Sequence, residues 1–526
     1  MTSESIDWDE DLPAEPEEEY QAFLRTLERT EGFRLLFVQC TPVEGDELIT
    51  KVKEELPKKT IEVLQFEEPI DNLYQIVKDL PNREQINILF IQGLEHSLYE
   101  YEQTKFGEKS ERFAYSWKGV PKILNHLNLH RERFRDTFNI CFVFLLRSFS
   151  LKYFIHRAPD FFDWRSSIFE FPTKPELLEK ESSRLIEEGD YDKYLSLTPQ
   201  EKIKKLLEIE ELLQEKHQTA GNKAELLREQ GKIFDAAEEY EAALIAFDKA
   251  IEIKRDLHQA WSNRGDTLRV MGRLEESLIA YDEAIQIKND YDIAWHNRGY
   301  ALFQLGRLEE AIATYNKAIE INSNDFSAWN NKGNARSNLG SLEEAVLAYN
   351  RAIEINPSYD WAWYNRGNAF YDLGKLTEAI LSYDKSIEIE PYDAEAWNKR
   401  GNALLKLGES EKAIESYDKV IEIKADNESA WVNRGNALLS LRKLTEAIES
   451  YDKAIKIKPD YHVAWSNRGI ALIRLGRWKE GIASNTKAFE INPSYQKEIL
   501  SQLINSLLKR TGLNKIYQIY TNFLKL

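Results

Sequence analysis

Residues 294–325 read AWHNRGYALFQLGRLEEAIATYNKAIEINSND, and the same pattern recurs along the second half of the chain. Its tryptophan returns every 34 residues, at Trp261, Trp295, Trp329, Trp363, Trp397, Trp431 and Trp465. A glycine follows each tryptophan by four residues, and a tyrosine follows it by twenty in every unit except the last, where Asn485 stands. A fixed period of this length is typical of a helix–turn–helix unit that cannot bury its apolar face alone and therefore stacks on copies of itself.

The spacing inside the quoted unit predicts two helices, one over about residues 294–306 and one over about Leu308–Ile321. Gly299 and Ala301 lack bulk, so the partner helix can approach closely. Gly306 suits a left-handed residue at the end of the first helix. We expect each repeated tryptophan to fill the seam between its helix and the neighbouring helices, as part of the core and not as a ligand cage.

These residues, in this register, resemble the tetratricopeptide repeat (TPR). The resemblance covers residues 224–495 and implies eight units that form an all-α superhelical solenoid. In the first unit Leu227 replaces the tryptophan, and in the seventh Arg442 stands where the others have a second glycine. The units begin near Ala224, His258, Asp292, Phe326, Asp360, Ala394, Glu428 and His462. Residues 496–526 are expected to form terminal helices that cap the open end of the stack.

Composition narrows the possible functions of this chain of 526 residues. Its formal net charge of −19 argues against general nucleic-acid binding, which needs a basic surface. The longest plainly apolar run, Ile140–Leu146, is far too short to span a bilayer, so no membrane insertion is expected. Its two cysteines, Cys40 and Cys141, lie in apolar runs and imply no disulfide framework. We therefore expect a cytoplasmic protein.

Two charged segments flank the remaining N-terminal region. Residues 1–30 begin with an acid-rich stretch that has no basic residue in its first twenty positions, so we expect a disordered acidic arm and not a signal peptide. Residues 173–223 have a charged helical pattern. We interpret them as a helical connector in preference to a dimerising coiled coil, because too few heptads are present.

Residues 31–172 alternate between short apolar runs and helical patterns, which predicts a three-layer α/β domain with a mostly parallel sheet. The expected strands are Phe33–Gln39, Ile61–Phe66, Ile86–Gln92, Phe138–Leu146 and Ser167–Phe171. The expected helices are Gly45–Glu55, Asn72–Leu80, Val120–Phe134 and Ser150–Arg157.

The first and third strands of this domain are followed by segments that resemble degenerate P-loop NTPase domains of the bacterial AAA/STAND type, many of them cyanobacterial and fused to TPR arrays. A phosphate loop requires G-x-x-x-x-G-K-[ST] after the first strand. Here Gly45 is in place, but Asp46 replaces the lysine that would meet phosphate. Gln92 replaces the acidic residue that would hold water on Mg²⁺. We therefore expect no catalytic residue, no nucleotide cofactor and no NTPase activity.

One histidine pair could in principle bind a metal. His126 and His130 stand four residues apart on a predicted helix, but no glutamate lies between them in the metalloprotease order. We favour a solvated helix face and predict no metal site.

The partner-binding residues are predicted from the resemblance, which implies that the first helix of each unit lines a concave groove. Residues two and five positions after each tryptophan share a helix face and are mostly asparagine, whose amide suits a peptide backbone of any sequence. Neighbouring aromatic residues would add apolar pockets. The predicted groove residues are Asn263, Asn297, Tyr300, Asn331, Asn334, Trp361, Tyr364, Asn365, Asn368, Tyr371, Asn402, Asn433, Asn436 and Asn467.

Two structural alternatives stay open for the polar residues of the repeats. The asparagines could merely solvate a face. The basic residue three positions after each tryptophan and the Asp or Asn one position after each second-helix aromatic form two matched ladders, which include Arg434 and Asp418. For these ladders we expect ion pairs or hydrogen bonds between repeats in preference to ligand contact.

These observations favour a protein–protein interaction scaffold that binds an extended segment of a partner protein. One alternative is a nucleotide-regulated STAND-like signalling or defence switch with the repeats as sensor. Another is an assembly factor for a larger complex.

Overall fold

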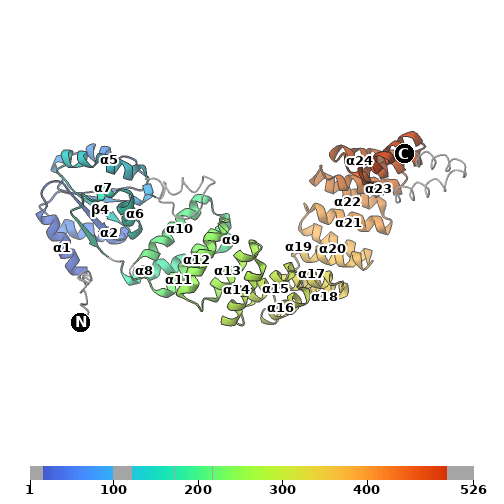
Figure 1. Cartoon of the computed structure of the whole chain (residues 1–526), viewed down its shortest axis with the longest axis horizontal. Coiled ribbons are helices and arrows are strands. Elements are labelled where there is room, and N and C mark those ends of the chain that lie inside the picture. The colour runs from blue at the N-terminus through green and yellow to red at the C-terminus, as the bar shows by residue number, and fades with distance from the viewer. Residues whose placement is uncertain (1–15, 99–120, 172, 216, 494–526) are drawn as a thin grey trace, which may run out of the picture. The chain divides into compact units, whose positions relative to one another are not determined.

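The computed structural model describes residues 16–98, 121–171, 173–215 and 217–493 (Figure 1). The chain divides into two compact units, residues 1–289 and 290–526. The first unit holds the α/β domain, a helical connector and the first helix pairs of the array. The second unit is helical throughout its described part.

The sheet of the first unit has five strands that all run parallel, in the order β2-β3-β4-β1-β5. Its strands are β1 (Arg34–Gln39), β2 (Ile61–Gln65), β3 (Ile88–Gln92), β4 (Cys141–Leu146) and β5 (Ser167–Glu170). The central strands are continuous apolar runs because helices cover both faces of the sheet. The prediction of an α/β domain followed by a helical solenoid is confirmed, and the sheet is wholly parallel.

Alternate strand residues point into two separate cores. Leu36, Val143 and Phe90 face α1 (Pro16–Arg29) and α2 (Pro42–Glu55). Phe37 and Phe142 face the opposite layer. That layer consists of α3 (Leu73–Lys78), α5 (Lys122–Thr137), α6 (Ser148–Arg157) and α7 (Pro159–Phe162), with the short 3-10 turn η1 (Arg83–Gln85) in the link before β3.

Helix α1 corrects the prediction of a disordered arm over residues 1–30. Residues 16–29 form a helix whose Tyr20, Phe23 and Leu27 are buried against the sheet, and the Phe23 ring meets that of Phe169 at 5.0 Å. These apolar residues recur at helical spacing, but the acidic residues around them dominate the composition. Residues 1–15 lie outside the described part of the chain.

The predicted connector is helical, as α8 (Pro175–Glu187), α9 (Tyr191–Ser196) and α10 (Pro199–Gln214). Its apolar residues, including Leu178, Tyr194 and Ile209, form one core with α11 (Ala220–Ala236). The first unit continues with α12 (Tyr240–Ile253), α13 (His258–Val270) and α14 (Leu274–Ile287). The connector and the first helix pair are therefore packed together.

The second unit is a series of antiparallel helix pairs. Their first helices are α15 (Asp292–Gln304), α17 (Phe326–Asn338), α19 (Asp360–Asp372), α21 (Ala394–Leu407), α23 (Glu428–Ser440) and α25 (His462–Leu475). Their second helices are α16 (Leu308–Ile321), α18 (Leu342–Ile355), α20 (Leu376–Ile389), α22 (Ser410–Ile423), α24 (Leu444–Ile457) and α26 (Trp478–Ile491). The predicted capping helices of residues 496–526 lie outside the described part.

Each pair of the second unit except the last, where Asn485 stands, packs a second-helix tyrosine against the glycine of its first helix. A Cβ atom added at Gly367 would lie 2.6 Å from the Tyr383 ring, so only glycine permits this approach. Tyr383 is fully buried, whereas Trp363 is half-buried and packs against a cluster that includes Ile353 of the preceding pair. The indole nitrogen of Trp363 also donates to the carbonyl oxygen of Pro357 at 2.8 Å. The tryptophans therefore seal the seams, and the tyrosines form the deepest core.

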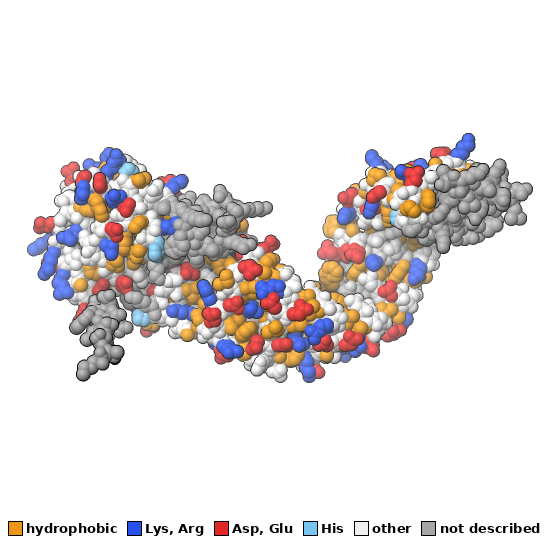
Figure 2. All heavy atoms as spheres, in the orientation of Figure 1, with side chains coloured by type: hydrophobic (Ala, Val, Ile, Leu, Met, Phe, Trp, Pro, Cys, Tyr) orange, Lys and Arg blue, Asp and Glu red, His pale blue; other side chains and the backbone are white. Residues whose placement is uncertain are grey.

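The predicted pairing between repeats is confirmed. The Nε atom of Arg434 on α23 lies 2.6 Å from a carboxylate oxygen of Asp418 on α22, and Arg434 also donates to Ser450 at 2.8 Å. The same arrangement recurs as Arg264–Asp248, Arg400–Asp384 and Arg468–Asp452. In the face shown in Figure 2, acidic and basic side chains alternate over the helical repeats, and neither sign dominates. Among the described helices, none has the length and apolar content that a membrane crossing needs.

Candidate functional sites

The first helices of consecutive pairs in the second unit contact one another directly, from α15 through α17, α19, α21 and α23 to α25. We call the side chains that they present along this line of contacts the first-helix face. It contains most of the residues predicted to bind a partner.

Four of the asparagines that lie two positions after a tryptophan bridge consecutive first helices. Asn365 donates to Asn330 at 3.1 Å, and Asn467 donates to Asn436 at 2.9 Å. Asn433 donates to Asn398 at 3.2 Å and Asn402 at 3.4 Å. Asn331 contacts the ring of His296 with 3.3 Å between nitrogen atoms. The structure therefore brings these amides into a row, but part of their hydrogen bonding is internal.

The asparagines five positions after each tryptophan accept a hydrogen bond from the core tyrosine of their own pair. The four bonds are Tyr349–Asn334 at 2.9 Å, Tyr383–Asn368 at 2.8 Å, Tyr417–Asn402 at 2.8 Å and Tyr451–Asn436 at 2.9 Å. Each bond fixes one amide oxygen and leaves the rest of the carboxamide to other partners. Sequence reasoning missed this bond, although its constant separation of 15 residues was available.

The remaining predicted residues lie in different settings. Tyr300 stacks on Phe303 with 6.5 Å between ring centres. Lys406 lies over the ring of Tyr371 at 4.5 Å. Asn297 is half-buried on α15. Asn263 belongs to the first unit, on α13, so it is not included in the first-helix face, which is defined within the second unit.

Two predicted aromatic residues form a corner with a residue that sequence reasoning did not select. Trp361 is 57% exposed, and its ring stands at 82° to that of Tyr364. The Tyr364 hydroxyl donates to Glu395 on the next first helix at 2.7 Å. Glu395 lies two residues before Trp397, and this position carries no constant residue type among the repeats, so the sequence pattern did not indicate a role for Glu395.

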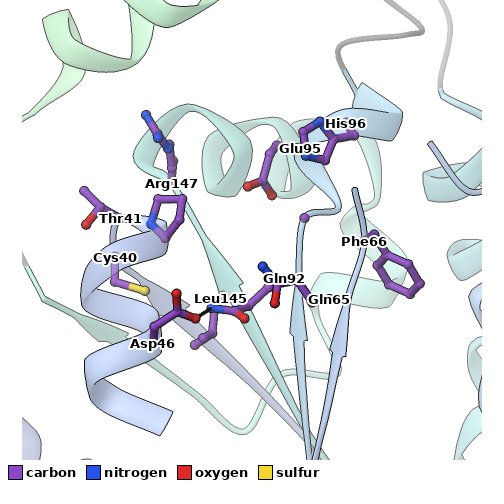
Figure 3. A pocket seen from close by; sticks show the side chains of 12 residues that line it. Cys40, Thr41, Asp46, Gln65, Phe66, Gln92, Glu95, His96, Leu145 and Arg147 are labelled. Atoms are coloured by element: carbon purple, nitrogen blue, oxygen red, sulfur yellow. Dashed lines mark hydrogen bonds between the residues drawn. The ribbon is translucent and has the colours of Figure 1, made fainter. Parts of the chain in front are cut away.

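The second candidate site is a pocket at the carboxyl ends of the strands (Figure 3), where ligands bind in open parallel sheets. It is lined by Cys40, Thr41, Pro42, Asp46, Gln65, Phe66, Gln92, Gly93, Glu95, His96, Leu145 and Arg147, around a cavity of about 120 Å³. Gln92 donates to Asp46 at 3.1 Å, so the two residues that depart from the NTPase pattern are paired with each other.

The start of α2, where a P-loop protein would hold phosphate, is capped by the chain itself. Glu44 accepts hydrogen bonds from the backbone nitrogen of Thr41 at 3.1 Å and from its hydroxyl at 2.8 Å. The Thr41 hydroxyl in turn accepts from the nitrogen of Glu44 at 3.3 Å, and Pro42 has no N–H. A carboxylate thus occupies the positive end of this helix. Sequence reasoning missed this capping box.

The one arginine of the pocket wall is held by another residue. Arg147 forms an ion pair of 2.6 Å with Glu211, a buried residue of connector helix α10. Burial raises the pKa of the Cys40 thiol well above its usual range, and the carboxylates of Glu44, Glu95 and Asp46 add to this effect. Cys40 is therefore protonated at neutral pH and is a poor nucleophile.

The histidine pair does not assemble a metal centre within the described residues. His126 and His130 have ring centres 4.3 Å apart, and no group of three potential ligands surrounds them in that part of the chain. Burial lowers the pKa of His126, with a further contribution from His130. Both side chains are half-buried and not fully solvated.

Comparison with known proteins identifies the repeats. The family model described as TPR repeat matches residues 265–306, 299–340, 333–374, 367–408 and 401–442, and a tetratricopeptide repeat model matches 429–461. No curated protein matches the chain as a relative.

Several solved structures are similar to parts of the chain. YrrB, described as a TPR protein with an unusual peptide-binding site, is 26% identical over 35% of this chain and 95% of its own, with a TM-score of 0.33. MamA is 26% identical over 31% of this chain and 96% of its own, with a TM-score of 0.30. The C-terminal part of a TPR repeat-containing protein from Cytophaga hutchinsonii is 18% identical over 45% of this chain and 98% of its own, with a TM-score of 0.41.

Proposed function

Because residues 265–461 carry tetratricopeptide repeats, we propose that this protein is an interaction scaffold whose first-helix face binds an extended segment of a partner protein. The observation that carries this proposal is the row of amides from Asn331 to Asn467, with aromatic residues beside it. We extend the array to eight repeats, because the outer pairs α11–α12 and α25–α26 keep the same close approach, at Gly231–Phe247 and Gly469–Asn485.

The hydrogen-bonding capacity of the amide row supports binding to a peptide backbone. A carboxamide has two donor positions and two acceptor positions, and the internal bonds of Asn334 and Asn365 use only part of this capacity. These internal bonds also hold each amide in place before a partner arrives, which lowers the entropy cost of binding. The internal role and the binding role are therefore compatible.

The α/β domain is proposed as a non-catalytic docking or regulatory module. Asp46 and Glu95 line the pocket, Glu44 caps the start of α2, and Arg147 is already paired with Glu211. Repulsion between carboxylates and phosphates would oppose nucleotide binding there. Calorimetric titration with Mg·ATP tests this part: we expect no binding, and micromolar binding would overturn it in favour of the nucleotide-regulated switch.

The two cysteines support a reducing compartment such as the cytoplasm. Both are buried, and neither forms a disulfide within the described residues.

The test of the scaffold uses the full chain and a displayed library of random dodecapeptides. Peptides selected on the wild type are remeasured against the double variant Asn365→Ala/Asn433→Ala, which removes two amides of the row. We expect affinity to fall by about tenfold or more, since hydrogen bonds in a desolvated interface are costly to lose. Asn316→Ala, a half-buried asparagine of second helix α16, is the matched control. Circular dichroism melts verify that the variants remain folded, and equal affinity of the double variant would contradict the assignment.

A further inference from the structure

Trp361 is an exposed indole at a repeat position where no other repeat has an aromatic residue. The equivalent position is Ser327 one repeat earlier and Glu395 one repeat later. Trp361 leaves 57% of its surface exposed, while Tyr364 beside it is buried, with 6.2 Å between the ring centres. Trp361 and Tyr364 lie on the same side of α19 as Asn365 and Asn368. Large aromatic side chains in such places are frequent anchors for a partner.

The charge beside this corner is negative. Glu395 is exposed and accepts the Tyr364 hydrogen bond with its Oε1 atom at 2.7 Å. Asp393, at the start of α21, accepts from the backbone nitrogen of Glu395 at 2.8 Å. The basic residues of α21 lie one or more turns further along the helix, at Lys399, Arg400 and Lys406, and Arg400 is already paired with Asp384. The corner therefore combines an aromatic face with a carboxylate.

Cations of the chain itself cover several aromatic rings of the array. Arg366 lies over Trp363 at 4.3 Å, and Lys332 lies over Trp329 at 4.7 Å. Within the described residues, no lysine or arginine is found over the ring of Trp361. The indole face at this position is thus open to a cation from outside the chain, and cation–π attraction is strongest for tryptophan.

We propose that Trp361, Tyr364 and Glu395 form an anchor for a basic side chain of the bound segment, with arginine preferred over lysine. The planar guanidinium stacks on the indole and donates to the Glu395 carboxylate, and an ammonium ion matches this geometry less well. This inference rests on the proposed function, because it specifies one residue of the segment that the first-helix face would bind.

The experiment uses the dodecapeptide selection on the full chain, followed by equilibrium binding of synthetic peptides. Selected peptides are expected to share an arginine or lysine at one position. Replacing that residue by citrulline, which keeps the shape of arginine without its charge, should weaken binding by about tenfold, and Trp361→Ser should do the same. Glu395→Gln keeps an acceptor for Tyr364 and removes the charge, so it should weaken arginine peptides and leave citrulline peptides unchanged. Leu347→Ser is the control, because Leu347 is 66% exposed on second helix α18.

The results separate this inference from the function on which it rests. Peptides that require Asn365 and Asn433, but contain no basic residue or bind Trp361→Ser equally well, would overturn the anchor and leave the scaffold in place. Selection that yields no peptide sensitive to the asparagines would overturn both. Loss of arginine preference in Trp361→Ser, with Leu347→Ser unaffected, is the supporting result.

Discussion

The hydroxyl of Tyr383 donates a hydrogen bond to the Oδ1 atom of Asn368 at 2.8 Å, from the second helix of a repeat to its first. Tyr383 is fully buried against Gly367, so the bond joins the deepest part of the core to an amide on the first-helix face. The amide row is therefore positioned by the same residues that hold each helix pair together.

Tyr383→Phe should lower the free energy of unfolding by about 1 kcal/mol, because it removes this hydrogen bond while it keeps the ring. It should also weaken selected peptides that contact Asn368, since the amide loses its fixed orientation. Urea unfolding followed by circular dichroism measures the first effect and peptide titration the second. Unchanged stability would show that water replaces the hydroxyl without cost.

Alkaline pH should destabilise the array through its buried tyrosines. Burial raises the pKa values of Tyr349, Tyr383, Tyr417 and Tyr451 well above their usual 10.0. The unfolded chain releases these protons near pH 10 and the folded chain retains them, so their stabilisation is complete below pH 10 and is lost as the pH rises further. The urea concentration at the midpoint of unfolding should decrease as the pH is raised above 10. Tyr383→Phe, with one fewer such group, should show a smaller decline.

Arg442→Gly should stabilise the protein. Arg442 has a φ angle of 60°, in the left-handed region, at the position where the other repeats have a glycine such as Gly374 with a φ angle of 76°. A side chain in this conformation costs roughly 1 kcal/mol, which glycine avoids. Thermal and urea unfolding of Arg442→Gly and Arg442→Ala tests this: only the glycine variant should gain stability, and a gain by both would implicate the arginine side chain instead.

The repeats were predictable from sequence because their contacts recur at constant separations. The period of Trp363 and its equivalents predicted the helix pairs. The matched ladders of basic residues and Asp or Asn predicted pairing between repeats, which the structure confirms, for example between Arg434 and Asp418. The Tyr383–Asn368 bond has an equally constant separation. It was not predicted because an asparagine amide can bond a peptide backbone or a tyrosine hydroxyl equally well, so the spacing alone does not select the partner.

The α/β domain shows what local patterns do not reveal. Its strands were predictable because buried parallel strands are apolar runs. The pocket was not, because Gln92 and Asp46 are 46 residues apart in sequence, and Arg147 and Glu211 are 64 apart, with no repetition to mark either pair. By contrast, the Thr41-x-x-Glu44 spacing is a capping-box pattern, so the carboxylate at the start of α2 could have been predicted from the sequence.

The Arg147–Glu211 ion pair joins the pocket to the connector, and its removal gives a test with a defined pH dependence. Glu211 is 3% exposed, so Arg147→Met leaves a buried carboxylate without its cation. The substitution should lower the free energy of unfolding by about 3 kcal/mol at neutral pH. Burial raises the pKa of Glu211, with Glu95 and Glu215 adding to the effect, and the loss of Arg147 can only raise it further. A carboxyl group whose pKa is higher in the folded than in the unfolded protein favours folding at low pH. The free energy of unfolding that Arg147→Met loses relative to wild type should therefore be smaller near pH 5 than near pH 8.

Urea unfolding of both proteins at the two pH values measures this deficit in the free energy of unfolding. Arg147→Met/Glu211→Gln, which lacks the charge, should show no such pH dependence, and an equal deficit of the single variant at both pH values would mean that Glu211 is not charged in the wild type.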